Sequence, residues 1–251
     1  MHDDDPQPIG GHQLLDRCRA ILAARGLTDT PPGPTDTTLT PDDPGHPDYH
    51  RRQRSQVALA RWERATPYRY QHATATHPDV ITWARRAAAD LRDVGFLVLN
   101  GNIGTGKTHE AYGALRRIAE SGPARYELIA TTAPDMYGRL RPGGSDKGTE
   151  YELRRLASVP LLLLDDLGTE KLSEWTEEAT YRLLNERYNQ CRPLIVTTNL
   201  PVRAPRDNHG QPTGPDLVTR LGERLASRLA EASTVITLTG PDRRRQLRNA
   251  S

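Results

Sequence analysis

The residue types most able to do chemistry gather in one glycine-rich stretch near the middle of the chain. An apolar run at 95–100 precedes the stretch, and a segment with apolar residues at helical spacing, 110–120, follows it. A strand, a glycine-rich turn ending in Gly-Lys-Thr and a helix form a phosphate-binding loop, whose backbone N–H groups and helix N-terminus face one anion. An ordinary strand-to-helix turn is the alternative, which the flanking strand and helix disfavour. The predicted nucleotide-binding residues are Gly101, Asn102, Ile103, Gly104, Thr105, Gly106, Lys107 and Thr108.

Polar side chains in and around this loop are candidates for magnesium binding and hydrolysis. Lys107 could reach the outer phosphates of a nucleotide, and the Thr108 hydroxyl could bind Mg²⁺. Ligands of a parallel sheet bind at the carboxyl ends of its strands, where Asp165, Asp166 and Asn199 are expected. Asp165 would hold the metal ion, Asp166 would orient or deprotonate the attacking water, and Asn199 would position that water. The alternative for these residues is a helix-cap or turn role.

An arginine stripe near the C-terminus allows two interpretations. Arg220, Arg224 and Arg228 are four residues apart in a helix predicted over 217–231, so they would share one face. Such a stripe is usually a solvated face that pairs with nearby glutamates. It can also supply an arginine that stabilises charge on a phosphoryl group in a neighbouring subunit. The helix alone does not decide between the two.

The elements that must position these residues alternate along the second part of the chain. Apolar strands separated by amphipathic helices are typical of an α/β fold, in which helices cover both faces of a parallel sheet. The strands are predicted at 95–100, 126–130, 160–168, 193–199 and 235–238. The helices are predicted at 78–93, 110–120, 135–141, 150–157, 173–188 and 217–231.

The N-terminal part has a different composition. Residues 12–26 have the spacing of a short amphipathic helix, and six prolines within 31–48 predict a linker. Residues 49–64 are arginine-rich and predict a solvated helix or a basic arm on nucleic acid. We therefore expect a small helical, partly disordered, partner-binding segment at 1–64 and an ATPase domain at 65–251. The alternative is a first helix that packs on its own main domain.

Composition sets further bounds. The 251 residues are 35% hydrophobic and 26% charged, enough for one large domain with some of the chain unpacked. A net charge of +2 does not by itself indicate a nucleic-acid partner. Cys18 and Cys191 are isolated, which disfavours a zinc module and suits a reducing compartment. No secretory signal and no apolar run of membrane-spanning length is present, so no membrane association and a cytoplasmic location are expected.

In their order and spacing these motifs resemble the AAA+ ATPases of the DnaC/DnaI helicase-loader and IstB group, over roughly residues 65–248. The resemblance implies an AAA+ type P-loop NTPase fold with Walker A at 101–108 and Walker B at Asp165 and Asp166. It also implies that Asn199 is sensor 1. The motifs that carry the resemblance are 101–108, 161–168, Arg187-Tyr188, 197–200, 222–229 and 242–245.

The same resemblance assigns three arginines. Arg228 would be the trans-acting arginine finger, Arg224 its companion, and Arg245 the sensor 2 residue that contacts the nucleotide in cis. Three arginines at 243–245 compete for the last role. The sequence departs from common AAA+ proteins in having Asp166 where Glu is usual, and from some loaders in lacking zinc ligands near the N-terminus.

Three functions compete. The leading hypothesis is a Mg²⁺-dependent ATPase that self-associates and loads the replicative hexameric DNA helicase onto single-stranded DNA. The second is an IstB-type ATPase that assists a transposase on duplex DNA, and the third is a nucleotide-gated adaptor with negligible hydrolysis. Residues 136–141 combine Tyr137 with arginines, as single-stranded DNA contact needs, although a plain amphipathic helix is an equal alternative.

Overall fold

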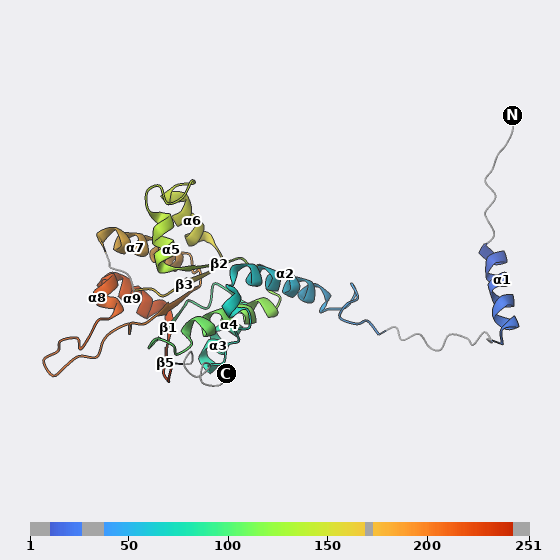
Figure 1. The fold of residues 1–251 in the computed structure, drawn as a ribbon, viewed down its shortest axis with the longest axis horizontal. Helices are drawn as coiled ribbons and strands as arrows, with labels where there is room; N and C mark the ends of the chain where they lie inside the picture. The colour runs from blue at the N-terminus through green and yellow to red at the C-terminus, as the bar shows by residue number, and fades with distance from the viewer. Residues whose placement is uncertain (1–10, 27–37, 169–172, 243–251) are drawn as a thin grey trace, which may run out of the picture. The chain divides into compact units, whose positions relative to one another are not determined.

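The computed structural model describes residues 11–26, 38–168 and 173–242 (Figure 1). The chain forms two units, of which the first comprises residues 1–40 and the second Pro41–Ser251. Helix α1 (Gly11–Ala24) belongs to the first unit, close to the helix predicted at 12–26, and it exposes Ile21 and Leu22. No helix in the described part of the chain combines the length and the apolar character needed to cross a membrane.

The second unit is built on a five-stranded sheet in the order β2-β3-β4-β1-β5, and all of its strand pairs are parallel. Strand β1 therefore lies inside the sheet, and the glycine-rich loop follows it there. The predicted α/β fold with a parallel sheet is confirmed. The strands are β1 (Phe96–Gly101), β2 (Leu128–Thr132), β3 (Leu161–Asp165), β4 (Leu194–Thr198) and β5 (Ser233–Leu238).

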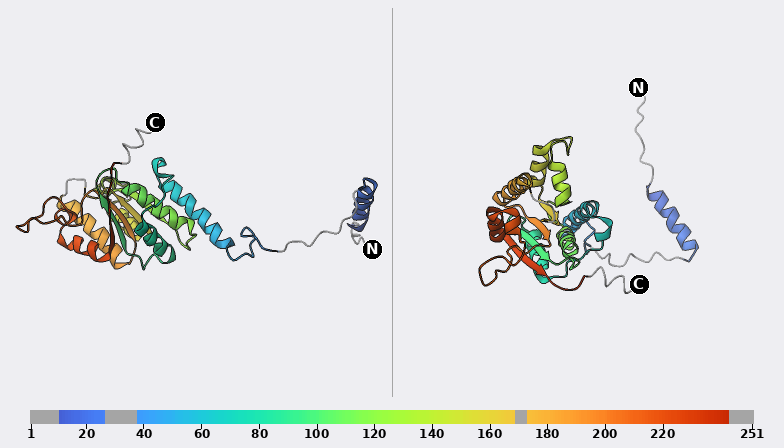
Figure 2. Two further views of the ribbon diagram at one scale, coloured as in Figure 1. Left: turned by 90° about the horizontal axis from the view of Figure 1, so that it is seen from below. Right: turned by 60° about the vertical axis from the view of Figure 1, so that its left-hand side comes forward.

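Helices cover both faces of the sheet (Figure 2). Successive side chains of β1 point to opposite faces, so Leu97 and Leu99 join one core cluster while Phe96 and Val98 join the other. The first cluster includes α2 (Tyr49–Ala65), α3 (Pro78–Ala89) and α4 (Lys107–Glu120). The second includes α5 (Ala133–Leu140), α6 (Thr149–Ser158), α7 (Glu174–Asn189), α8 (Leu217–Leu221) and α9 (Glu223–Ala232).

Helix α2 corrects the expected domain boundary. Ala58 and Trp62 are buried in the first core cluster, and the Trp62 indole donates a hydrogen bond to the carbonyl oxygen of Tyr112 at 3.1 Å. Arg61 donates to the carbonyl oxygen of Tyr126 at 2.7 Å. The boundary expected after residue 64 is therefore too late, because α2 is part of the unit that begins at Pro41. The other residues of α2 are mostly polar. With so few apolar residues, the sequence pattern does not show that Trp62 packs the helix onto the core.

The helix expected over 217–231 is two helices, because the chain breaks at Gly222. Gly222 has φ +82°, and a side chain there would meet the Glu177 carboxylate, with Cβ 2.7 Å from Oε1. Glycine alone adopts such a conformation at little cost. The break separates Arg220 on α8 from Arg228 on α9, so the expected stripe on one continuous helix is wrong.

Candidate active site

The eight predicted nucleotide-binding residues occupy the turn from β1 into α4. Gly104 has φ +85° and Gly106, which precedes the first turn of α4, has φ +99°. L-residues with side chains rarely adopt these angles, so the sequence places glycine where the turn requires it. The turn curls over the N-terminus of α4, where unpaired N–H groups and the helix dipole favour an anion. The geometry fits the phosphate groups of a nucleotide.

Lys107 is folded back along the inside of this turn. Its Nζ donates hydrogen bonds to the carbonyl oxygens of Gly101 and Asn102, each at 2.8 Å, and the residue is 6% exposed. The carbonyl bonds hold the ammonium group at the loop and supply part of the solvation that burial removes. The charge is therefore already beside the turn that would hold an anion.

A hydroxyl–carboxylate network joins the loop helix to the ends of two neighbouring strands. The Thr108 hydroxyl donates to Asp165 Oδ1 at 3.0 Å, and the Thr197 hydroxyl donates to the same oxygen. Thr197 in turn accepts a hydrogen bond from the Asp166 backbone N–H at 2.9 Å. Burial raises the pKa of the Asp165 carboxyl, although the bond from Thr197 opposes this shift. The two predicted metal ligands, Thr108 and Asp165, are thus in contact.

Asp166 and Asn199 lie at the same carboxyl edge of the sheet. Asp166 follows β3 with φ +58°, a left-handed conformation that is uncommon for a residue with a side chain and that clusters at functional sites. Asn199 follows β4, whose Thr198 pairs in register with Asn100 at the end of β1. Its half-buried side chain makes no hydrogen bond with any described residue. The structure therefore brings the polar ends of β1, β3 and β4 together.

Two residues of this region were not predicted from the sequence. Thr197 links both aspartates, and its place in the Thr-Thr-Asn motif was the only signal for it. Glu110 is 1% exposed and accepts hydrogen bonds from the backbone N–H groups of Thr76 at 2.9 Å and His77 at 3.2 Å. It ties the segment before α3 to the loop helix, and an acidic residue at a buried helix position was the available clue.

The three predicted arginines are placed differently. Arg228, on α9, makes its contacts with α7 rather than with the loop. Arg224 lies on the same helix, and its side chain is outside the described part of the structure. Arg245 is outside the described residues as well, but the chain that leads to it reaches the loop. The Asp242 carboxylate lies so near Gly104 that a Cβ on the glycine would be 2.0 Å from Oδ1.

The arginine-containing tract at 136–141 packs inward. Met136, Tyr137 and Leu140 are buried in the second core cluster, and the Tyr137 hydroxyl shares a 2.5 Å hydrogen bond with Thr180. A ring enclosed in this way presents no face on which a base could stack. The interpretation of Tyr137 as a DNA-stacking residue is therefore wrong, and the amphipathic-helix alternative describes α5.

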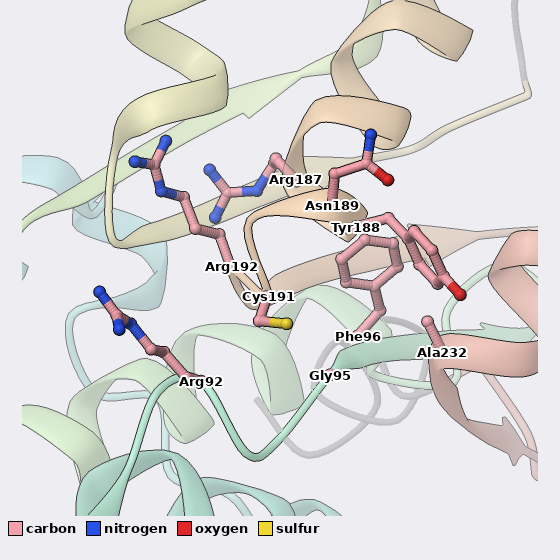
Figure 3. A pocket seen from close by; sticks show the side chains of 9 residues that line it. All are labelled: Arg92, Gly95, Phe96, Arg187, Tyr188, Asn189, Cys191, Arg192 and Ala232. Atoms are coloured by element: carbon pink, nitrogen blue, oxygen red, sulfur yellow. The ribbon is translucent and has the colours of Figure 1, made fainter.

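A pocket of about 450 Å³ lies at the other end of the sheet (Figure 3). Gly95 and Phe96 at the start of β1 line it, so it is on the side opposite the phosphate-binding turn. The Arg92 and Arg192 side chains lie on one side of it and the Phe96 and Tyr188 rings on the other (Figure 3). This pocket is separate from the candidate nucleotide site.

The parallel sheet in the order β2-β3-β4-β1-β5, the glycine-rich turn after β1 and the acid at the end of β3 define a P-loop nucleotide-binding fold of the AAA+ class. The chain belongs to the family of IstB-like ATP binding proteins, whose family model matches residues 48–250. The match begins beside α2, in agreement with the unit boundary. The chain is therefore an IstB-like ATP-binding protein related to helicase loaders.

Individual relatives are of two kinds. An ATP-binding protein in an insertion sequence of Mycobacterium tuberculosis is 28% identical over 202 residues, which cover 76% of each chain. The replicative helicase loader DnaI of Bacillus subtilis is 28% identical over 104 residues, or 41% of this chain and 32% of the loader. Among solved structures, that of the DnaC helicase loader has a TM-score of 0.56 and 26% identity. It covers 69% of this chain and 100% of that chain.

Proposed function

We propose that this protein is a Mg²⁺-dependent ATPase that self-associates and assists a transposase on DNA. The observation that carries the hydrolytic part is the Thr108–Asp165–Thr197 network, which lies against the phosphate-binding turn. A partly buried carboxylate with a threonine hydroxyl beside a P-loop is the arrangement that P-loop NTPases use to hold Mg²⁺.

The residues divide the work by position. The N–H groups of the turn and Lys107 bind and orient the phosphates of ATP, and Arg245 contacts the same nucleotide in cis. Thr108 and Asp165 hold Mg²⁺, which when bound neutralises charge that develops on the phosphate oxygens. The described residues contain no group of three or more His, Cys, Asp or Glu side chains suited to a metal. That fits Mg²⁺, which proteins usually bind through one or two carboxylates, water and substrate phosphates.

Hydrolysis requires a positioned water. Asp166 orients this water or takes its proton, and Asn199 holds it in line with the terminal phosphate. The proton of the water passes to Asp166 as the new bond to phosphorus forms, and ADP leaves. Arg228 of a neighbouring subunit, with Arg224 beside it, stabilises the charge of the transferring group.

Catalysis can be tested with one conservative change. Asp166→Asn keeps the size of the side chain but removes the base, so steady-state turnover should fall by about 100-fold or more while ATP binding persists. Lys107→Ala should lose ATP binding as well. An unchanged rate for Asp166→Asn would refute the assignment of Asp166. A wild-type rate near zero, with and without DNA, would instead favour the nucleotide-gated adaptor.

The choice of partner rests on the extent of the relationships. The M. tuberculosis insertion-sequence protein aligns over 76% of both chains, whereas the B. subtilis helicase loader aligns over 41% of this one. Helicase loading onto single-stranded DNA remains the second candidate because the DnaC loader fold covers 69% of this chain. Pull-downs with a transposase from an insertion sequence and with a replicative helicase separate the two functions, as do assays on duplex and single-stranded DNA.

We also propose that the first unit binds the partner. Its helix α1 exposes Ile21 and Leu22, which are 53% and 46% accessible and which a partner helix or groove would bury. Deletion of residues 1–40 should abolish capture of the partner and preserve ATP binding. Ile21→Ser combined with Leu22→Ser should weaken capture in the full chain. Undiminished capture by the deletion variant would place the docking surface on the second unit.

A further inference from the structure

The Arg228 side chain contacts three side chains of helix α7. Helices α7 and α9 are in contact (Figure 1). The Arg228 guanidinium carbon lies 5.2 Å from the ring centre of Tyr181 and 5.8 Å from that of Tyr188. Its Nη1 donates a hydrogen bond to Asn185 Oδ1. Tyr181, Asn185 and Tyr188 are four and then three residues apart, so they share one face of α7.

These contacts hold the guanidinium without using up its donors. Aromatic rings attract a cation through their faces, and they accept little from the in-plane N–H groups. Arginine has five N–H donors, and among the described residues the bond to Asn185 is the only hydrogen bond that this guanidinium makes. The side chain is half-buried, so the other donors have access to the surface.

Within the described residues, Arg228 forms no ion pair with a carboxylate. Glu231 is on the same helix, but it accepts a hydrogen bond from the Tyr188 hydroxyl at 2.9 Å instead. That bond also fixes one of the two rings against which the guanidinium lies. The arrangement leaves a positive charge of fixed position with unused donors, as an anion from another molecule would require.

We propose that Tyr181, Asn185 and Tyr188 are positioning residues that present Arg228 to the terminal phosphate in a neighbouring subunit. This inference rests on the proposed ATPase function, and it names side chains that act through Arg228 rather than on ATP. We refer to the three as the arginine cradle. The competing account is that Arg228 merely packs α9 onto α7.

The first test compares changes of one ring. Tyr181→Phe keeps the aromatic face and should leave turnover within about twofold, whereas Tyr181→Leu keeps the bulk but loses the cation–π attraction and should lower kcat by about 5- to 30-fold. The KM for ATP should not change, because the cradle lies outside the subunit's own nucleotide site. Tyr151→Leu is the matched control, since the Tyr151 ring faces Lys147 at 4.8 Å and belongs to no proposed site. It should leave kcat unaltered.

The second test uses mixed assemblies, which a packing role would not distinguish. Lys107→Ala chains retain Arg228 but cannot hydrolyse ATP, and Arg228→Ala chains retain the nucleotide site but supply no finger. Mixing the two should restore turnover at the sites of the Arg228→Ala chains. Adding Tyr181→Leu to the Lys107→Ala chain should reduce the restored rate by the same 5- to 30-fold factor. Adding it to the Arg228→Ala chain should not reduce that rate.

The outcomes separate the two proposals. If Arg228→Ala alone leaves turnover unchanged, the trans-acting arginine is wrong and the cradle is overturned with it. Suppose instead that Arg228→Ala abolishes turnover, but that Tyr181→Leu lowers the restored rate equally in whichever chain carries it, or in neither chain. The ATPase proposal then stands and the cradle is overturned. A loss confined to the chain that donates Arg228, with thermal stability like that of Tyr181→Phe, supports the cradle.

Discussion

Two charged side chains at opposite ends of the strands, one fully buried and one partly buried, show how differently a protein can use a charge. Arg187, near the end of α7, is 0% exposed, and its Nη atoms donate only to backbone carbonyl oxygens. Asp165, at the carboxyl end of β3, is held by two threonine hydroxyls. The carbonyls that accept from Arg187 belong to the segments entering β3 and β4, namely Leu156, Ala157, Val159, Pro160 and Pro193.

The two charged side chains, Arg187 and Asp165, differ in the groups that bind them. Five protein carbonyls accept hydrogen bonds from the two Nη atoms of Arg187, so its charge serves to join the segments that enter the sheet, although its buried Nε has no partner among the described residues. A carboxylate offers about four acceptor positions, and the hydroxyls of Thr108 and Thr197 occupy only part of them. Burial also raises the pKa of Asp165, so its negative charge is better stabilised once a cation is bound. A charge beside the phosphate-binding turn that retains acceptor positions indicates a ligand site, whereas a charge enclosed by backbone carbonyls indicates a structural role.

The largest effect is expected at Arg187, the charge that backbone carbonyls enclose. Arg187→Met should lower the free energy of unfolding by about 3–5 kcal/mol, because it leaves several buried carbonyls without donors. Urea denaturation measures this loss, and Arg154→Met, an exposed arginine on α6, is the control with little change. A loss below about 1 kcal/mol would mean that water replaces the guanidinium and that the contrast with Asp165 does not hold.

At Asp165 we expect the reverse: a large loss of turnover and little change in the free energy of unfolding. Asp165→Asn should lower Mg²⁺-dependent turnover by about 100-fold or more but change the free energy of unfolding by less than about 1 kcal/mol. The amide avoids the burial penalty of the carboxylate, and its oxygen can still accept from a threonine. Nucleotide binding without Mg²⁺ should persist. Asp93→Asn, an exposed carboxylate, serves as the control in both measurements.

A third prediction concerns Thr197, whose hydrogen bonds hold Asp165 and Asp166 in place. Thr197→Val keeps the shape but removes the bond to Asp165 and the acceptor for the Asp166 N–H, so turnover should fall by about 10-fold. The unfolding free energy should fall by about 1–2 kcal/mol, since the partly buried Asp166 N–H loses the Thr197 hydroxyl as its acceptor. Thr131→Val, on strand β2 of the same sheet, should leave turnover unaltered. Equal turnover in both variants would show that Thr197 does not position the aspartates.

The smallest effect concerns a carboxylate whose bonds are all structural. Asp216 caps α8: burial alone would raise its pKa, but hydrogen bonds donated by Thr219 and the Ala204 N–H outweigh burial and lower the pKa. Asp216→Ala should cost about 1 kcal/mol at neutral pH and leave kcat intact. Because the folded-state pKa is lowered, this contribution is present above the ordinary value near 3.8 and is lost as the pH falls through the folded-state pKa. A stability difference that persists in acid would contradict the assignment.

The nucleotide site was predictable to the extent that it is local in sequence. Gly104, Gly106 and Lys107 form a continuous turn, and the apolar runs before Asp165 and Asn199 place both residues at strand ends. The order of the strands in the sheet, and therefore which strand ends lie side by side, could not be predicted from such local patterns. Thr197 lies 32 residues from Asp165 and contacts it only because β3 and β4 pair in register.

Packing decided the remaining differences from the prediction. Helix α2 joins the second unit chiefly through Trp62 and Ala58, two buried positions in a mostly polar helix that no periodic pattern displays. Tyr137 is turned into the core, although its neighbours in the sequence suggested a surface for DNA. The helix breaks at Gly222, which has φ +82° and which the Glu177 carboxylate of α7 approaches too closely for a side chain.

By itself the sequence determined the class of fold, the phosphate-binding turn and the residues at the strand ends, since these depend on backbone preference and alternating hydrophobicity over a few neighbouring positions. Only the tertiary structure decided which groups bind the charged side chains of Arg187 and Asp165, and how Arg228 is held. Those properties depend on which distant groups meet a side chain and how many of its donors or acceptors they occupy. A linear pattern does not specify such contacts, because they form only when strands and helices pack together.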